Sequence, residues 1–307
     1  MNGKREKVMF SISRRRFLQR GTILATASLV PSLPGRTWVA LTGVPIGIQL
    51  YTVGQELLKD VSGTLKQIRD IGYTEVETAG FAGLTAKQFR GELDKAGLNC
   101  HSAHLQWNSP DLSPVFADAQ ALGVHFVVSS GLFPPGEGAQ PTVDAYKKMA
   151  AHINYIARGA QHAGLQYAYH NHNFEFKDLG DGKIGYDVLL DETDPSLVDF
   201  ELDCGWMVAA GYSPVQYFKK YPQRYKMLHI KDFVRGSGPS TSLARELRPQ
   251  GTELGRGYID YRPILEAAAR TAVKYYYVEQ EPPFPDMTAM QATKVDYDYL
   301  HDLQESR

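Results

Sequence analysis

Eight short runs of β-forming residues alternate with helical stretches along this chain, and this order constrains the fold more than any other feature. It predicts parallel strands joined by helical crossovers. Eight strand–helix units in about 250 residues match a closed (β/α)₈ barrel that forms a single domain. The predicted strands are 46–51, 75–78, 99–104, 125–129, 166–171, 198–203, 225–231 and 274–279.

The segments between these strands carry apolar or alanine-rich patterns at helical spacing. An open doubly wound sheet is the alternative architecture. That fold favours a glycine-rich phosphate loop after the first strand, and residues 49–54 do not form one. The predicted helices are 57–71, 86–96, 115–122, 142–163, 214–221, 261–269 and 287–303, with a fainter pattern at 185–192.

Residues 1–40 resemble a twin-arginine export signal, because arginines 14–16 precede an aromatic–leucine pair and a short apolar run at 21–30. We expect this segment to be a signal peptide that contacts the twin-arginine translocation machinery. The remainder, 41–307, is then the barrel domain of a periplasmic or otherwise extracytoplasmic protein. The apolar run is far shorter than the roughly 20 residues of a membrane span, so we expect none in the mature form. A basic amphipathic tail is the alternative interpretation.

The net charge of −1 hides an asymmetry between the two parts of the chain. The first forty residues hold eight Lys or Arg and one Glu, which leaves 25 bases and 33 acids, a net charge of −8, in residues 41–307. An acidic body binds nucleic acid poorly. We therefore expect no nucleic-acid partner.

Polar side chains crowd the carboxyl ends of seven of the eight predicted strands, where a (β/α)₈ barrel builds its active site. Because side chains alternate along a strand, residues two apart share a face. Imidazoles and carboxylates together suit Mn, Zn, Co, Mg or Fe, not a thiolate site. Ordinary surface hydrogen bonding is the alternative. The pairs that share a face are His170 with His172, Glu201 with Asp203, His229 with Lys231, and Glu279 with Glu281.

Three segments resemble the xylose-isomerase-like TIM barrels, the superfamily of the sugar phosphate isomerases/epimerases. Residues 169–176 read Tyr-His-Asn-His-Asn-Phe-Glu-Phe, residues 201–206 read Glu-Leu-Asp-Cys-Gly-Trp, and residues 228–232 read Leu-His-Ile-Lys-Asp. The resemblance spans roughly residues 44–300. It is specific for the superfamily and much less so for the substrate.

The resemblance implies one divalent metal ion held by residues from strands five to eight. Asp203, His229 and Glu279 match ligand positions of the family directly. The strand-five ligand is usually a glutamate, whereas the matching residue here is His170, and His172 or Glu175 are the alternatives. These departures leave the fourth ligand open.

The resemblance further implies a sugar isomerase, epimerase or lyase that abstracts a proton next to the carbonyl of a keto-sugar or 3-keto-glycoside. Glu279 or a strand-five histidine, His172, is the candidate base. Lys231 is the candidate that protonates or hydrogen-bonds an oxygen. The metal would stabilise the enediolate that forms when the proton leaves.

Five further residues are candidates for substrate binding, each with a simpler alternative. His104 and Glu77 offer hydrogen bonds, although Glu77 also fits a buried structural carboxylate. Trp107 and Trp206 are candidates for stacking against a sugar ring. The alternative is that they only pack against other residues of the barrel rim. Arg256 is a candidate for binding an anionic group of the substrate. The alternative is an ordinary arginine on a solvated loop.

Two other functions stay open. One is a phosphodiesterase like endonuclease IV of the same superfamily, which the acidic body opposes. Trp206 also opposes it, because it stands where relatives often carry a histidine ligand. The other is a non-catalytic periplasmic sugar-binding barrel, which three matched ligands oppose.

Overall fold

The computed structural model describes residues 43–306 except 108, 132–141, 237, 243 and 245. The export signal predicted at 1–40 lies outside the described residues, so it stays a prediction. Among the residues that the structure describes, no helix combines the length and apolar character needed to cross a membrane.

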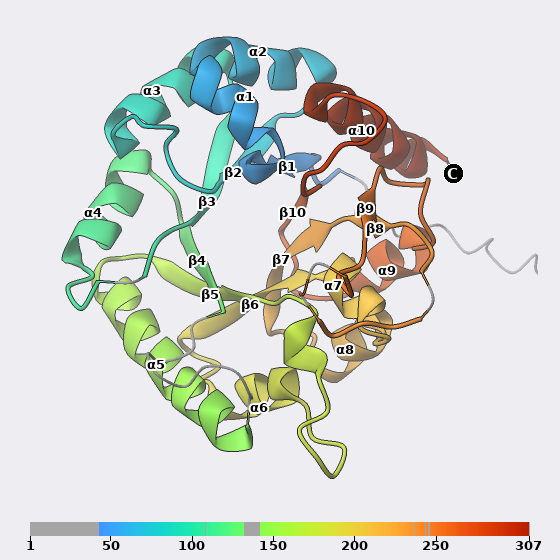
Figure 1. The fold of residues 1–307 in the computed structure, drawn as a ribbon. Helices are drawn as coiled ribbons and strands as arrows, with labels where there is room; N and C mark the ends of the chain where they lie inside the picture. Colours follow the sequence, from blue (N-terminus) through green and yellow to red (C-terminus); the bar gives the residue numbers. More distant parts are fainter. Residues whose placement is uncertain are drawn as a thin grey trace, which may run out of the picture. The chain divides into compact units, whose positions relative to one another are not determined.

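The strands close into a parallel barrel surrounded by helices, which confirms the predicted (β/α)₈ fold (Figure 1). Around the barrel the order is β1, β10, β7, β6, β5, β4, β3, β2, so β10 is the eighth barrel strand. The barrel strands are β1 Gly47–Gln49, β2 Glu75–Thr78, β3 Asn99–His104, β4 Phe126–Ser130, β5 Gln166–His170, β6 Val198–Asp203, β7 Tyr225–Ile230 and β10 Tyr275–Val278.

The apolar core has two parts, as closed barrels require. A large cluster fills the space between the strands and the helices. A small cluster of inward-facing side chains fills the lower part of the barrel, so that the polar groups of the same strands are confined to the upper part. The small cluster consists of Phe126, Val128, Ala168, Met227 and Tyr277.

Apart from α7, which was not predicted, the helices agree with the predicted segments except at the first one. A single helix was expected at 57–71, but the chain forms α1 and α2, separated at Asp60. The backbone of Asp60 is extended and its side chain accepts a hydrogen bond from the Gly63 nitrogen (2.9 Å), so Asp60 starts a new helix instead of continuing the old one. The helices are α1 Gly54–Lys59, α2 Val61–Ile71, α3 Ala86–Ala96, α4 Ser113–Leu122, α5 Val143–His162, α6 Gly185–Glu192, α7 Cys204–Ala209, α8 Pro214–Lys220, α9 Tyr261–Ala268 and α10 Ala289–Glu305.

Short secondary-structure elements lie in the loops that follow β1, β5 and β7. The 3₁₀ turns η1 (Leu50–Val53) and η2 (Phe174–Phe176) follow β1 and β5. The two-stranded ladder of β8 (Asp232–Phe233) and β9 (Gly251–Thr252) follows β7. These turns and the ladder, like α7, were not predicted, because segments of two to six residues carry too little periodic pattern.

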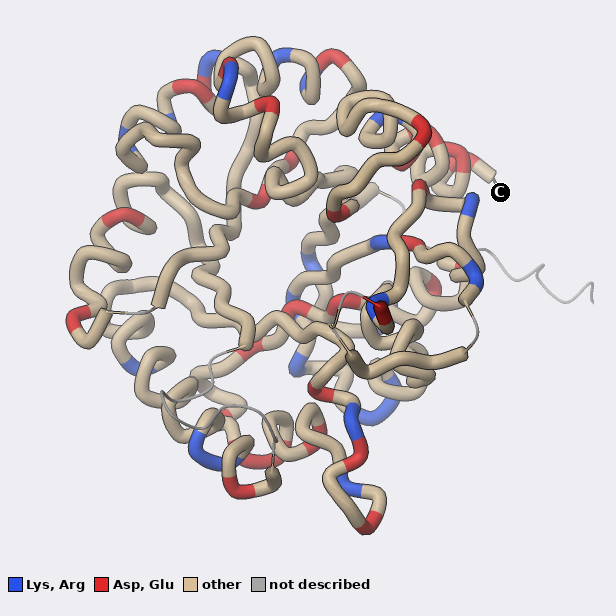
Figure 2. Tube along the Cα trace, viewed as in Figure 1, with Lys and Arg blue, Asp and Glu red and all other residues tan. Residues whose placement is uncertain are grey.

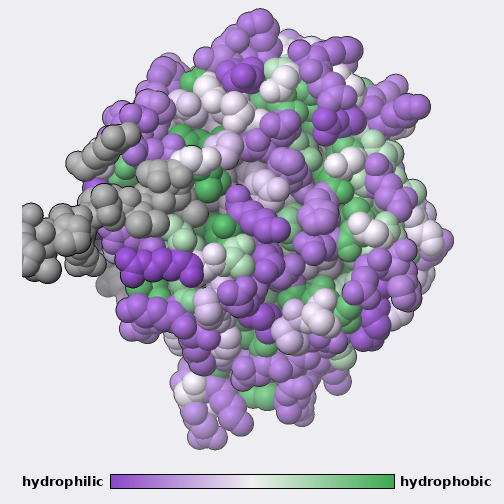
Figure 3. Space-filling view, turned by 180° about the vertical axis from the view of Figure 1, so that it is seen from behind, coloured by the Kyte–Doolittle hydropathy of each residue, from purple (hydrophilic) through white to green (hydrophobic). Residues whose placement is uncertain are grey.

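Charged residues of both signs are spread over the outer helices, and others lie on the chain around the centre of the ring (Figure 2). On the face seen in Figure 3, hydrophobic residues are scattered among hydrophilic ones. Charged residues therefore occur near the barrel centre as well as on the outer surface.

Candidate active site

The carboxyl ends of four neighbouring strands bring two histidines and two carboxylates together. His170 ends β5, Asp203 ends β6, His229 is the penultimate residue of β7, and Glu279 directly follows β10. One donor atom from each residue lies within 4.8 Å of those of the others, and all four residues are buried. We call these four residues the upper group. They are the residues that the sequence analysis predicted as metal ligands.

Asp203 uses its two oxygens differently. Oδ1 accepts a hydrogen bond from the backbone nitrogen of Trp206 (2.7 Å) and so caps α7. Oδ2 lies 3.0 Å from Nζ of Lys231 and 3.8 Å from Nε2 of His170, but it accepts no well-aligned hydrogen bond. Buried oxygens without such a bond are rare in folded proteins, so this one points to a ligand.

Lys231 places a buried ammonium group beside the upper group. Its Nζ lies 2.5 Å from Oε2 of Glu279, 3.0 Å from Asp203 and 3.0 Å from Oε1 of Glu281. Burial alone would lower the pKa of Lys231, but the three carboxylates outweigh it and raise that pKa above its usual value. Lys231 is therefore a persistent cation that can donate hydrogen bonds but cannot act as a base.

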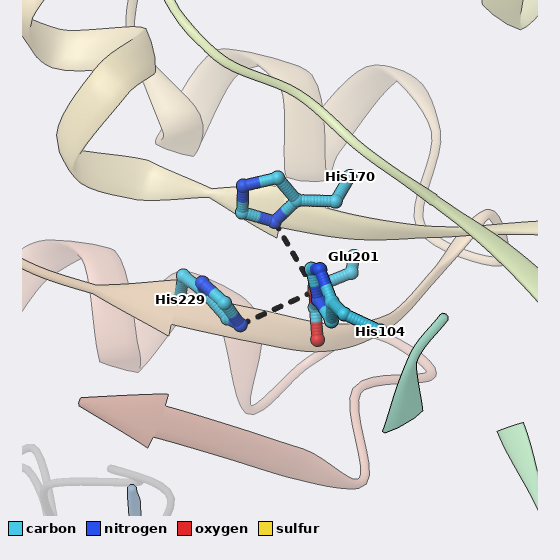
Figure 4. A group of neighbouring side chains, drawn as sticks. All are labelled: His104, His170, Glu201 and His229. Carbon is cyan, nitrogen blue, oxygen red and sulfur yellow. Dashed lines mark hydrogen bonds and ion pairs between the residues drawn. The ribbon is translucent and has the colours of Figure 1, made fainter. Parts of the chain in front are cut away.

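A second set of donors lies deeper in the barrel, and we call it the deeper set. It consists of His104, Glu201 and Glu77, and it contacts both histidines of the upper group, His170 and His229. Oε2 of Glu201 lies 2.8 Å from Nε2 of His104 and 3.1 Å from Nδ1 of His170. It also lies 3.2 Å from Nε2 of His229. Figure 4 shows the imidazole rings gathered around Glu201. Glu77 completes the set, with Oε2 2.6 Å from Nε2 of His229 and 3.2 Å from Nε2 of His104.

The charges in this deeper set compensate each other. Burial would lower the pKa of His104, but Glu77 and Glu201 raise it to about 10. Burial, reinforced by the charge of Glu77, raises the pKa of Glu201 to about 7. The pKa of Glu77 lies below its usual value, since His104 and His229 outweigh the effect of burial. His104 is thus a cation held between two acids.

His172 stands beside the upper group with an uncommitted ring nitrogen. Its Nδ1 is buried and has no hydrogen-bond partner, and its ring centroid lies 5.1 Å from that of His170. Burial, with the nearby charge of Lys231, lowers the pKa of His172 to about 4. The imidazole is therefore neutral at physiological pH, which is the form that accepts a proton.

Glu175 is also buried, but both of its oxygens are engaged away from the upper group. Oε1 accepts a hydrogen bond from the Tyr169 hydroxyl (2.7 Å), and Oε2 accepts one from the backbone nitrogen of His172 (2.9 Å). Of the three strand-five candidates for the fourth ligand, the structure brings only His170 into the upper group. Glu175 instead holds the backbone from which the His172 ring projects.

A cavity of about 570 Å³ opens beside the upper group. Trp206, Lys231 and Glu279 contribute to its wall, together with Glu281 and Arg248. Nζ of Lys231 lies 5.0 Å and the guanidinium carbon of Arg248 lies 5.4 Å from the Trp206 ring. Arg248 is also ion-paired with Glu281. A polar ligand in this cavity would meet an aromatic face, two cations and the upper group.

Two predicted substrate contacts do not reach this cavity. Trp107 is 6% exposed and packs against Phe116 and Tyr167, and its indole nitrogen donates to the Val128 carbonyl (2.9 Å), so it supports the rim. Arg256 is half-exposed and pairs with Glu253 (3.3 Å). The sequence did not separate these alternatives, because it does not show which way a side chain on a loop turns.

The other three predicted contacts lie close to the upper group. Trp206 lines the cavity, whereas His104 and Glu77 belong to the deeper set. The Glu77 side chain contacts Gln49, Ser102, His104 and His229. Glu77 is therefore engaged with other side chains inside the barrel and does not line the cavity.

Three residues of the site had no role assigned to them from the sequence. Strand alternation placed Glu201 and Glu281 on the same face as Asp203 and Glu279, but it gave neither a function. Arg248 lies in a loop, and nothing in its sequence context distinguishes it from other arginines.

Gly205 makes room for the lysine of the site. A Cβ atom at this position would lie 2.3 Å from Cγ and 2.7 Å from the carbonyl oxygen of Lys231. Such distances do not occur between real atoms, so no larger residue fits beside Lys231 in this backbone.

Comparisons with known proteins agree with the architecture. An inosose dehydratase from Lacticaseibacillus casei is 26% identical over 243 residues, which cover 75% of this chain and 77% of that protein. The solved structure of a sugar phosphate isomerase/epimerase from Parabacteroides distasonis superposes with a TM-score of 0.69 at 27% identity, over 86% of this chain and 95% of that one.

A further solved structure, of an IolI protein with a bound zinc atom, has a TM-score of 0.63 at 15% identity, over 85% of this chain and 98% of that one. At this identity the likeness shows the fold. The inosose dehydratase and the isomerase/epimerase are sugar-acting enzymes, which supports an enzyme of isomerase, epimerase or lyase type. Residues 65–295 match the model of the xylose isomerase-like TIM barrel family, and the chain belongs to that family.

Proposed function

We propose that this protein is a divalent-metal-dependent enzyme that removes the proton next to the carbonyl of a keto-sugar or 3-keto-glycoside. The product is then an isomer, an epimer or an elimination product. The observation that carries the proposal is the upper group, four buried donors within 4.8 Å of one another beside a neutral histidine and a buried ammonium group.

The upper group fits a metal ion by its chemistry. His170 and His229 offer nitrogen, Asp203 and Glu279 offer oxygen, and Oδ2 of Asp203 is buried without a well-aligned hydrogen bond. Two nitrogens and two oxygens suit Mn, Zn, Co, Mg or Fe. Such an ion, when bound, supplies a Lewis acid that polarises a carbonyl oxygen.

His172 is the base that the geometry favours. It is neutral, and its Nδ1 is free to take a proton from carbon. Glu279 is the weaker candidate, because Lys231 and His229 overcome the effect of burial and hold its pKa well below the usual value. Lys231 donates a hydrogen bond to the oxygen on which negative charge develops. A positioned base contributes about 10²–10⁴-fold to the rate of such a step.

The same residues accommodate an elimination from a 3-keto-glycoside. The C–H bond next to the ketone breaks and its proton goes to Nδ1 of His172. The electron pair forms a carbon–carbon double bond as the bond to the glycosidic oxygen breaks. His172 then returns the proton to that oxygen, so the aglycone leaves as an alcohol and the base is regenerated.

The names of the relatives and the cavity wall support a small carbohydrate as the substrate. Trp206 offers an aromatic face of the kind on which sugar rings stack, and Glu281 and Arg248 offer hydrogen bonds to hydroxyl groups. Export by the twin-arginine pathway, which we propose from residues 1–40, favours a free or glycosidic sugar over a cytosolic sugar phosphate.

The test is deuterium incorporation into keto-sugars and 3-keto-glycosides in deuterated water, with release of the aglycone as a second readout. We expect turnover to disappear with a chelator, to return with added Mn²⁺ or Zn²⁺, and to be lost in His172→Gln while bound metal is retained. His162→Gln, an exposed residue at the end of α5, is the matched control and should behave as the wild type. Binding of these sugars without exchange or release would contradict the proposal and favour a binding barrel, and cleavage of abasic DNA instead would favour a nuclease.

A further inference from the structure

The two histidines of the upper group each present their second ring nitrogen to the deeper set. Nε2 of His170 faces Asp203 (3.8 Å), while its Nδ1 faces Glu201 (3.1 Å). Nδ1 of His229 faces Glu279 (3.2 Å), while its Nε2 faces Glu77 (2.6 Å). Both rings therefore bridge one carboxylate above and one below.

A neutral imidazole has one nitrogen that carries a proton and one that offers a lone pair. If the upper group binds the metal, Nε2 of His170 and Nδ1 of His229 must offer their lone pairs. The protons then lie on Nδ1 of His170 and Nε2 of His229. These are the two nitrogens that lie within hydrogen-bond distance of Glu201 and Glu77.

From this arrangement we infer that Glu201 and Glu77 are positioning residues, which fix the two histidine ligands in opposite tautomers and aim them at the metal. The inference rests on the proposed metal site. A ligating histidine that donates its second N–H to a carboxylate is held in orientation and is a more basic ligand. Here two carboxylates deep in the barrel contact two histidine ligands that come from β5 and β7, the strands on either side of β6.

His104 has a defined part in this arrangement. Glu77 and Glu201 both approach Nε2 of His104, at 3.2 and 2.8 Å, from strands on opposite sides of the barrel. Nε2 of His104 thus lies between the two carboxylates and links them beneath the ligands. Figure 4 shows His104 next to Glu201. His104 therefore supports the carboxylates and does not itself need to reach the substrate.

The same atoms allow a competing arrangement. His104, His170, Glu201 and His229 also have donor atoms within 4.8 Å of one another. A metal ion bound there would take the lone pairs of Nδ1 of His170 and Nε2 of His229, and both tautomers would be reversed. The two arrangements are therefore distinguished by where two protons lie.

The first experiment is long-range ¹H–¹⁵N correlation of the histidine rings in the full-length, zinc-loaded protein, assigned with His170→Gln and His229→Gln. We expect a proton on Nδ1 of His170 and on Nε2 of His229. Reversed tautomers would overturn the inference, because they place the metal in the deeper set and make Glu201 a ligand.

The second experiment measures the Kd for zinc, by competition with a chromophoric chelator, in Glu201→Gln and Glu77→Gln. Loss of such a partner typically weakens metal binding about 10–100-fold, and we expect a value in that range for each variant. Each variant should also broaden or shift the ring signals of the histidine that it contacts. Unchanged Kd and unchanged tautomers in both variants would refute the inference.

Glu75→Gln is the matched control. Glu75 lies two residues before Glu77 on β2, is 6% exposed, and contacts Asn99 (2.9 Å) and His101 (3.2 Å) but no residue of the upper group. It removes a buried, histidine-paired carboxylate without touching a ligand, so Kd should stay at the wild-type value. An equal loss in this control would show a general effect on the barrel and overturn the specific role of Glu201 and Glu77.

The outcomes separate this inference from the proposed function. A wild-type protein that binds no metal ion contradicts the proposed function. A wild-type protein that binds one equivalent, with Kd unaffected by Glu201→Gln and Glu77→Gln, leaves the proposed function intact and removes the positioning role.

Discussion

Replacement of Glu175 by glutamine should stabilise the protein, and more strongly at alkaline than at acidic pH. The side chain of Glu175 is fully buried between Tyr169 and the backbone of His172. Glutamine has the same shape. Its carbonyl can accept from the His172 nitrogen while its amide donates to the Tyr169 oxygen, so the substitution removes a charge, keeps both neighbours and reverses the direction of one hydrogen bond.

The size of the effect follows from the pKa of Glu175. Burial raises that pKa from 4.5 to about 7. The protonated form is thus the one that the fold favours, and stability is lost as the pH rises from the unfolded value of 4.5 to about 7. A difference of about 2.5 pKa units corresponds to about 3 kcal/mol of unfolding free energy at pH 8, and to less than about 1 kcal/mol at pH 5.

The assay is urea denaturation of metal-free wild type and Glu175→Gln at pH 5 and pH 8. The variant should gain about 3 kcal/mol relative to the wild type at pH 8 and little at pH 5. Glu305→Gln, which removes an exposed carboxylate, is the control and should show no such difference. An equal gain at both pH values, or a loss at pH 8, would refute the reasoning, because the charge of Glu175 would then carry no penalty. Metal affinity should be unchanged in Glu175→Gln, since its oxygens face away from the upper group.

Three other predictions concern the site and the signal. Asp203→Asn keeps the cap of α7 but removes the charge of Oδ2, and metal affinity should fall at least about tenfold in a chelator competition assay; retained affinity would count against the upper group. Arg248→Ala should raise KM several-fold by removing a cation from the cavity wall, whereas Arg256→Ala should leave KM unchanged; similar effects of both would argue against the cavity as the substrate site. Replacement of Arg14 and Arg15 by lysine should retain the protein in the cytoplasm, as cell fractionation would show, and undiminished export would rule out the twin-arginine route.

The barrel was predictable because each unit repeats the same local pattern. Strand 198–203 and helix 86–96, for example, agree with their predicted bounds to the residue. The break at Asp60 was not anticipated, since Asp fits both an exposed helix position and an N-cap. The outcome there depends on a single hydrogen bond to Gly63, which no periodic pattern reports.

For the site, the family resemblance matched Asp203, His229 and Glu279 directly, and it left the strand-five member open among His170, His172 and Glu175. Alternation assigns a side chain to a face, but it does not say which residue it meets across the barrel. The contact between Glu77 on β2 and His229 on β7 spans 152 residues of sequence, so only closure of the barrel reveals it. The contribution of Arg248 depends likewise on the path of a loop.

The missing side chain at Gly205 has a consequence for the evolution of related chains. A Cβ atom there would overlap the backbone carbonyl oxygen of residue 231 as well as the lysine side chain, so a shorter residue at 231 would not make room for it. A lineage that gains any larger residue at 205 must first shift the backbone that follows β7. We therefore expect glycine to be retained at 205 in homologues that keep this backbone, whichever residue stands at 231.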